Sequence, residues 1–244
     1  MRKYFLKILL VVSIANLSLA AGPKVPYTHE GFYSTEMTQK AIHFVSIDDI
    51  KKSLEGVAPI NVSFDIDDTL LFSSQYFQYG QQHYQIPNHP KGKISYLYNQ
   101  KYWDYVANQG DEHSIPKKST MEIIKMHLER GDKIFFITGR TGHSRQKNYT
   151  STKLSKTLQR YFDLPKEVYV EYTGDTPTGG FKYDKSFYIK KHNVSIHYGD
   201  SDDDILAARE LGIRGIRVQR AYNSTNPQKL NGGYGEEVVI NSAW

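Results

Sequence analysis

The sequence predicts an α/β fold with a parallel sheet, and two observations carry that prediction. Apolar runs of strand length alternate with amphipathic segments of helical length over most of residues 46–218. Three of the apolar runs end directly in polar residues, which are Asp65, Thr138 and Asp200. Parallel strands joined by right-handed crossovers place their carboxyl ends at one edge of the sheet. We therefore expect these three side chains to meet at that edge.

Each element has its own local signal. The first helix, 47–54, begins after the cap residue Ser46, carries acids in its first turn and ends before Gly56. Gly131 and Gly212 end two later helices in the same way. The expected helices are 47–54, 120–129, 151–161, 185–191 and 203–211, and the expected strands are 60–64, 133–137, 168–170, 194–198 and 215–218.

The chain divides into four stretches. Residues 1–20 have the layout of a cleavable signal peptide, with basic residues followed by an apolar stretch of about a dozen residues, too short for the roughly 20 of a membrane-spanning helix. Residues 21–45 lack periodicity and are predicted as an N-terminal arm. One domain is expected over 46–244, and the run of Gln, Tyr, Asn, Pro and Gly over 73–118 is predicted as a cap insertion in it.

Charge and composition limit the function. Loss of residues 1–20 removes three basic residues and no acidic one, so the formal net charge falls from +5 to +2. A nearly neutral mature chain argues against a nucleic-acid partner. The chain has no cysteine, so no disulfide supports an exported form. The signal peptide predicts a secreted, periplasmic protein with no membrane attachment after cleavage.

The run 62–71 carries the chemistry. It leads a buried strand into Asp65 and Asp67, which can aim at one point if the chain leaves its strand after Asp65. One carboxylate could then attack phosphorus while the other handles a proton. Attack on a phosphate monoester dianion requires a metal and fixed positive charge nearby. The alternative is an Asp-rich turn after a strand.

A second acidic run follows the strand at 194–198. Four carboxylates lie between Asp200 and Asp204 with no base among them, which indicates a hard cation with oxygen ligands such as Mg²⁺. Asp200 is predicted as a direct ligand, and Asp204 as holding coordinated water or orienting the site. Thr138 and the backbone N–H groups of Gly139 and Arg140 could receive phosphoryl oxygens. The candidates for the fixed positive charge are Lys182, Lys185, Lys190, Lys191 and Arg140.

These motifs resemble those of the haloacid dehalogenase (HAD) superfamily of phosphatases, and within it the class B bacterial acid phosphatases. The matching segments are 64–69, 71–74, 136–140, 198–202 and 235–238. The resemblance implies a Rossmannoid three-layer sandwich with a small helical cap. It also implies an Mg²⁺-dependent acid phosphatase that forms a homotetramer.

The resemblance assigns roles position by position. Asp65 would be the nucleophile that forms an aspartyl-phosphate, and Asp67 the general acid and base. Mg²⁺ would be held by Asp65, the Asp67 carbonyl and Asp200. Lys185 would neutralise the phosphoryl group. Arg140 would contact substrate, with a helix-end ion pair as the alternative.

An apolar pocket for the leaving group is also implied by the resemblance. It maps onto Phe77, Leu97 and Trp103, for which core packing is the alternative. The resemblance also implies an aromatic residue at position 226, where this chain has Asn226, and Tyr222 is a candidate substitute. The expected substrates are phosphomonoesters, including nucleoside monophosphates and aryl phosphates, with phosphate transfer to alcohols as a further activity. The competing hypothesis is an exported protein that binds nucleotides or aromatic ligands without catalysis.

Overall fold

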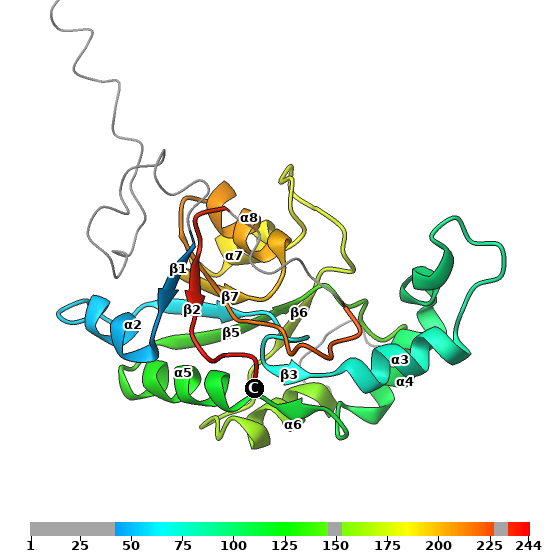
Figure 1. The fold of residues 1–244 in the computed structure, drawn as a ribbon, viewed down its shortest axis with the longest axis horizontal. Coiled ribbons are helices and arrows are strands. Elements are labelled where there is room, and N and C mark those ends of the chain that lie inside the picture. The colour runs from blue at the N-terminus through cyan, green and yellow to red at the C-terminus, as the bar shows by residue number, and fades with distance from the viewer. Residues whose placement is uncertain (1–41, 146–152, 227–233) are drawn as a thin grey trace, which may run out of the picture.

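Seven parallel strands form the centre of the protein (Figure 1). The computed structural model describes residues 42–145, 153–226 and 234–244. The strand order is β1-β9-β8-β7-β2-β5-β6, and every neighbouring pair runs parallel. The strands are β1 His43–Val45, β2 Asn61–Phe64, β5 Lys133–Thr138, β6 Val170–Tyr172, β7 Ile196–Gly199, β8 Arg214–Arg217 and β9 Glu237–Val239.

Helices cover both faces of this sheet, which confirms the predicted three-layer α/β fold. In Figure 1, α5 and α6 lie below the sheet while α7 and α8 lie above it. No helix in the described ranges is long and apolar enough to cross a bilayer. The helices around the sheet are α2 Ile47–Ser53, α5 Lys118–Glu129, α6 Lys153–Tyr161, α7 Ser186–Lys191 and α8 Asp202–Glu210.

Most expected elements are present, with small shifts at their ends. The predicted cap at Ser46 is confirmed, because its hydroxyl accepts from the Asp49 amide at 3.0 Å and the Asp49 carboxylate accepts from the Ser46 amide at 2.9 Å. The strand expected at 168–170 lies instead at Val170–Tyr172, where it pairs with the end of β5. Strands β1 and β9 were not predicted; they pair with each other, and β1 occupies the last three residues of the predicted arm. The arm from 21 to 41 lies outside the described residues.

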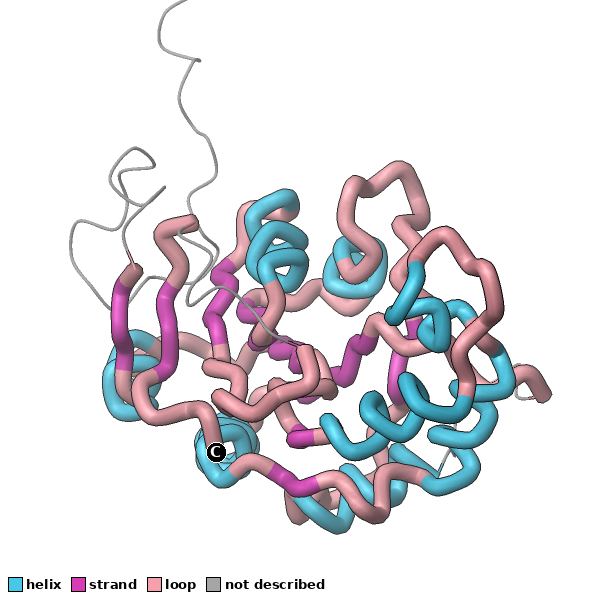
Figure 2. Tube along the Cα trace, turned by 45° about the vertical axis from the view of Figure 1, so that its right-hand side comes forward, coloured by secondary structure: helices cyan, strands magenta, loops and turns pink. Residues whose placement is uncertain are grey.

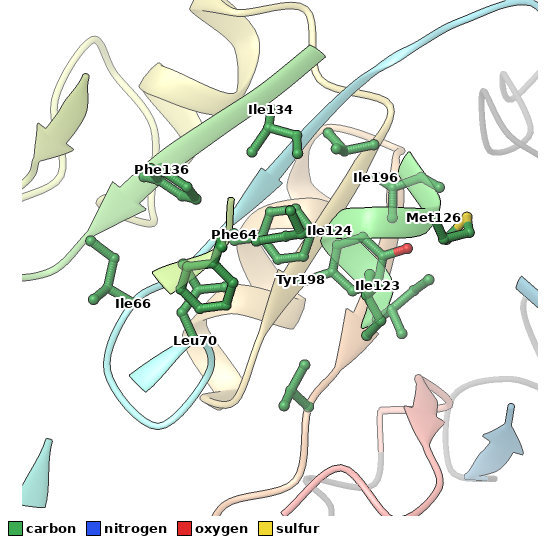
Figure 3. Packing of buried hydrophobic residues seen from close by; sticks show 14 of the residues in the cluster. Phe64, Ile66, Leu70, Ile123, Ile124, Met126, Ile134, Phe136, Ile196 and Tyr198 are labelled. Carbon is green, nitrogen blue, oxygen red and sulfur yellow. The ribbon is translucent and has the colours of Figure 1, made fainter. Parts of the chain in front are cut away.

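The core forms between β2, β7 and the helices below the sheet (Figure 3). Phe64 and Tyr198 stack with ring centroids 4.7 Å apart, and both are fully buried. Ile123 and Ile124 of α5 pack into the same cluster. Complete burial of such a side chain contributes on the order of 2 kcal/mol. This packing fixes the strands that carry the acidic motifs.

The segment predicted as a cap insertion forms a separate helical region at one end of the sheet (Figure 2). Two short antiparallel strands, β3 Leu71–Phe72 and β4 Ile115–Pro116, pair with each other and enclose residues 73–114 of this segment in the sequence. Aromatic residues of this region pack on one another rather than on the main core. The elements between the two strands are α3 Ser74–His83, the 3₁₀-helix η1 Gly92–Tyr98 and α4 Gln100–Gln109.

The strand order reverses at β2. From β2 the chain builds outward through β5 and β6, and it then returns to β7 on the other side of β2. Parallel α/β sheets bind ligands beyond the carboxyl ends of the strands at such a reversal. The residues after β2 and β7 therefore occupy the position where a site is expected.

Candidate active site

Asp65 and Asp200 emerge side by side from β2 and β7. The Asp65 amide donates to the Tyr198 carbonyl at 2.8 Å, so the sheet pairing continues to the first carboxylate. Thr69 crosses between the two segments, because its hydroxyl donates to Asp200 at 3.1 Å. Asp65 and Asp200 are both buried and line one cavity of about 210 Å³. The predicted convergence of these two strand ends is present in the structure.

Lys185 joins this acidic group. Its ammonium donates to Asp65 and to Asp204, each at 2.5 Å. Burial raises the pKa of Asp65 well above its usual range, reinforced by the negative charges of Asp204 and Asp200, although Lys185 opposes the shift. The pKa of Lys185 itself lies well above its usual range, because the two carboxylates outweigh the effect of burial. One lysine therefore serves two carboxylates at the base of the cavity.

Asp67 faces a different cation. The Arg140 guanidinium donates to the two Asp67 oxygens at 2.6 and 2.8 Å, and the Ser73 hydroxyl donates to Asp67 at 2.5 Å. Arg140 also makes two hydrogen bonds to Asp111, at 2.6 and 2.8 Å. Burial alone would raise the pKa of Asp67, but the Arg140 charge and these hydrogen bonds hold it below its usual value. Arg140 is buried, and it makes the ion pair that the sequence left as its alternative role.

The directions of these two pKa shifts bear on the roles that the resemblance implies. A nucleophilic Asp65 must be ionised, and an Asp67 that gives a proton must be protonated. Among the protein groups alone the shifts run the other way, with the pKa of Asp65 raised and that of Asp67 lowered. A divalent cation bound at Asp65 would stabilise its carboxylate, and a phosphate bound beside Asp67 would disfavour the Asp67 anion. Both ligands would therefore move the two groups toward the states that these roles need.

The turn after β5 contributes backbone atoms, more than side chains, to the lining of the cavity. Thr138 is fully buried and lies outside the cavity lining; its hydroxyl accepts from the Arg140 amide at 3.3 Å. Gly139 lines the cavity beneath Asp175, and a Cβ there would lie 2.2 Å from an Asp175 oxygen. An added Cβ would therefore require the Asp175 side chain to move. The Asp175 carboxylate also lines the cavity, and partial desolvation together with the Asp184 charge raises its pKa to about 6.

Apolar side chains of the cap region also line the cavity. Phe77, Leu97 and Trp103 all line it. The Trp103 indole donates to the Leu97 carbonyl at 2.7 Å, which fixes the ring. Asn226 also lines the cavity, whereas Tyr222 does not and is 93% exposed. In this structure Tyr222 therefore does not contribute to the lining of the cavity.

The acidic residues after β7 have basic partners that the sequence did not reveal. The sequence places no base beside these carboxylates, but distant basic residues reach three of them. Arg217 pairs with Asp202 at 2.8 Å, Arg220 with Asp200, and Lys185 with Asp204. These partners come from β8, the loop after it and the start of α7, so local spacing could not reveal them. Of the five candidates for the fixed positive charge, Lys185 and Arg140 line the cavity.

Several residues in or around the site were not predicted from the sequence, and three of them make charged contacts to the predicted residues. Asp111 follows the last turn of α4, far from any motif, and nothing in its surroundings signals a partner for Arg140. Arg220 lies just past β8, so the rule that polar residues follow strand ends could have found it. His197 lies within a buried strand, where a histidine is ordinarily structural, yet it contacts Asp204 at 3.1 Å.

The donor set fits a hard divalent cation. Oxygens of Asp65, Asp200 and Asp204 lie within 4.8 Å of one another, and all three residues are buried. The raised pKa of Asp65 reflects in part the mutual repulsion that a cation would relieve. Asp204 already accepts from Lys185, His197 and Ser201, so Asp65 and Asp200 are the carboxylates better placed for direct ligation.

Comparisons with known proteins agree with this geometry. The family model described as HAD superfamily, subfamily IIIB (acid phosphatase) matches residues 20–227. A class B acid phosphatase of Haemophilus parainfluenzae is 50% identical over 236 residues, covering 95% of this chain and 94% of that protein. One from Aggregatibacter actinomycetemcomitans is 47% identical over 243 residues, covering 98% of this chain and 97% of that protein.

A solved structure supports the fold alone. It is that of a predicted phosphoglycolate phosphatase from Haemophilus somnus, with a TM-score of 0.50 and 14% identity over 76% of this chain and 95% of that one. The sheet order, the paired strand ends and the family match define a phosphatase of the HAD superfamily. Within that superfamily the chain belongs to the class B acid phosphatases. This sets aside the hypothesis of a binding protein without catalysis.

Proposed function

We propose that the protein hydrolyses a broad range of phosphomonoesters through an aspartyl-phosphate on Asp65, with Mg²⁺ as its cofactor. The observation that carries this proposal is the cavity itself. A buried carboxylate bonded to Lys185 lies at its base beside Asp200, and an apolar wall stands opposite. One side suits a phosphoryl group, and the other suits an apolar leaving group.

The chemistry proceeds in two displacements. A carboxylate oxygen of Asp65 bonds to phosphorus while the bond from phosphorus to the leaving oxygen breaks, and Asp67 gives its proton to that oxygen. Water then attacks the same phosphorus, Asp67 takes a proton from it, and the bond to Asp65 breaks to release inorganic phosphate. Lys185 stabilises the phosphoryl charge, and the backbone after Thr138 donates to its oxygens. An alcohol in place of water would give phosphate transfer.

The cation has a defined place in this proposal. Asp65, the Asp67 carbonyl and Asp200 would hold Mg²⁺, with Asp204 supporting the site. When bound it supplies positive charge that offsets repulsion between the carboxylates and the phosphoryl oxygens. Arg140 fixes the Asp67 carboxylate and lines the cavity, where it can also meet substrate.

The wall favours leaving groups with an apolar face. Phe77, Leu97 and Trp103 offer ring and aliphatic surface to an aryl group or a nucleobase. Nucleoside monophosphates and aryl phosphates are therefore the proposed substrates. Asn226 places an amide in this wall.

Location and assembly form a separate part of the proposal. The layout of residues 1–20 supports export to the periplasm through a cleaved signal peptide. The similarity to class B acid phosphatases of bacteria, which covers almost the whole chain, supports the same assignment. We also propose a homotetramer. Sedimentation of the mature protein as a monomer would remove that part.

Release of p-nitrophenol from p-nitrophenyl phosphate near pH 6 tests the catalytic proposal. The activity should disappear with EDTA and return with added Mg²⁺. A panel of nucleoside monophosphates, sugar phosphates and aryl phosphates, with metal analysis of the purified protein, tests the breadth of substrates and the cation. Activity that survives complete removal of divalent metal would contradict the proposal.

A further inference from the structure

The carboxylate of Asp204 is fully engaged. One oxygen accepts from the Ser201 amide at 3.0 Å and the Ser201 hydroxyl at 2.7 Å, which is the capping box of α8. The other oxygen accepts from Lys185 at 2.5 Å and from His197 at 3.1 Å. A carboxylate offers about four lone-pair directions, and all are occupied. Asp204 is thus a junction between the helix cap, the lysine and the histidine.

His197 lies one step further from the cavity. It is fully buried on β7, directly across from Ser63 of β2 in the sheet register. Its Nδ1 lies 2.8 Å from the Ser63 hydroxyl, and its Nε2 faces Asp204. Because an ionised carboxylate can only accept, Nε2 carries the proton of that contact. Ser63 therefore holds the ring in the orientation that donates to Asp204.

This donor affects how Lys185 divides its contacts. The ammonium is shared between Asp65 and Asp204, at 2.5 Å from each. Without His197, the Asp204 oxygen would keep the ammonium as its only donor and would attract it more strongly. Lys185 would then move its charge away from Asp65. The helix cap cannot compensate, because Ser201 binds the other oxygen.

We propose that the Ser63–His197 pair is a positioning device that acts through Asp204 to hold Lys185 on Asp65. The inference rests on the proposed role of Lys185 as the group that neutralises the phosphoryl charge. Neither Ser63 nor His197 lines the cavity, so neither touches substrate. The loss of this device should lower the rate of phosphoryl transfer and weaken phosphate binding.

The structure provides a matched control on α5, which packs against the same sheet. His127 is also a buried imidazole between a carboxylate and a hydroxyl, at 2.7 Å from Asp132 and 2.8 Å from Tyr198. Within the part of the chain that the structure describes, Asp132 and Tyr198 make no hydrogen bond to Lys185. His127→Phe thus removes an equivalent network without touching Asp204.

The experiment compares His197→Phe, His197→Gln and His127→Phe in the full mature protein. The readouts are kcat and KM for phenyl phosphate with saturating Mg²⁺, and calorimetric binding of inorganic phosphate. We expect His197→Phe to lower kcat and phosphate affinity about 10-fold each, the scale of one hydrogen bond to a charged group. His197→Gln keeps an N–H donor and should recover most of the loss. His127→Phe should lower the melting temperature while kcat stays within about twofold.

Two further variants make every outcome decisive. If His197→Phe does not fold, Ser63→Ala replaces it, with an expected loss of about threefold in kcat. Lys185→Met separates the two proposals. Full activity in Lys185→Met refutes the proposed role of Lys185, whereas an inactive Lys185→Met beside a folded His197→Phe with normal kcat overturns only the positioning device. Equal losses in His197→Phe and His197→Gln would also overturn it.

Discussion

The two sides of the cavity are built differently. Its floor, which we define as Asp65, Asp67, Lys185 and Asp200, consists of charged groups at the carboxyl edge of the sheet. Each is held by hydrogen bonds to partners distant in sequence, such as Lys185 to Asp65. Its wall, defined as Phe77, Leu97 and Trp103, comes from the cap region and is held mainly by the packing of rings.

This difference separates the residues that carry out phosphoryl transfer from those that select the leaving group. A change in the floor leaves buried charges without partners and alters the reacting groups themselves. A change in the wall alters apolar contact with the leaving group and leaves the reacting groups in place. We therefore expect floor variants to lose activity on every substrate, and wall variants to lose it in proportion to the apolar size of the leaving group.

The largest effect is expected for Asp65→Asn. The amide cannot attack phosphorus, so kcat should fall at least about 10⁴-fold on all substrates while the fold is kept. The matched control is Asp163→Asn, at an exposed position outside the cavity, which should retain full activity. Steady-state assays on the two purified variants check this. Substantial activity in folded Asp65→Asn would mean that another group is the nucleophile.

Asp67→Asn should follow, with a loss that depends on the leaving group. A general acid contributes about 10²- to 10⁴-fold, and it matters most for a poor leaving group. We expect a loss near the top of that range for an alkyl phosphate and near the bottom for p-nitrophenyl phosphate. Measuring kcat for both esters gives the ratio directly. An equal loss on the two esters would argue against proton transfer by Asp67.

Phe77→Ala tests the wall. The variant should lose about 10-fold in kcat/KM for phenyl phosphate, because part of an aromatic ring's burial energy is removed. Methyl phosphate, which does not reach the wall, should be hydrolysed within about twofold of the normal rate. Tyr79→Ala on the same helix, outside the cavity lining, is the control. If both esters lose activity equally, the wall does not select the leaving group.

The smallest effect on catalysis is expected at Lys117, a second buried lysine near the floor. Its ammonium donates to two neutral carbonyls, those of Asp68 at 2.7 Å and Gln219 at 2.6 Å. Burial lowers its pKa to about 8, although the Asp200 and Asp68 charges oppose the shift. Lys185, with two carboxylate partners, has its pKa shifted upward instead. The contrast indicates that burial lowers the pKa of a lysine here unless carboxylates bond its ammonium directly.

Linkage gives the sign of the pH dependence. Between about pH 8 and the ordinary lysine value of 10.5, the folded state binds fewer protons at Lys117 than the unfolded state does. The free energy of unfolding should therefore rise with pH in that window, by at most about 1.4 kcal/mol per pH unit. Lys117→Met should lack this contribution. Urea unfolding of both proteins from about pH 7.5 to 10 compares the slopes, and identical slopes would refute the prediction.

Much of the floor could be predicted from sequence, because strand-end residues of a parallel sheet converge. Asp65 and Asp200 needed only an apolar run before each of them. The pairing of Arg140 with Asp111 could not be predicted, since it depends on how the end of α4 sits against the turn after β5. The strands β1 and β9 are only three residues long, too short for a recognisable pattern.

The wall was predicted by resemblance rather than by pattern. Phe77, Leu97 and Trp103 lie in three different elements, and their ring and aliphatic side chains show no spacing that distinguishes a pocket from a small core. Their neighbours Tyr76, Tyr96 and Tyr102 form that core. Only the three-dimensional arrangement separates the residues that line the cavity from those packed behind them.

Capture of the phosphorylated enzyme tests the central claim most directly. The mature protein would be mixed with ³²P-labelled substrate and Mg²⁺, quenched in acid within milliseconds, digested and mapped. The account predicts a hydroxylamine-sensitive label on Asp65 that is absent from Asp65→Asn. A label on any other residue, or phosphate release with no label at all under single-turnover conditions, would contradict it.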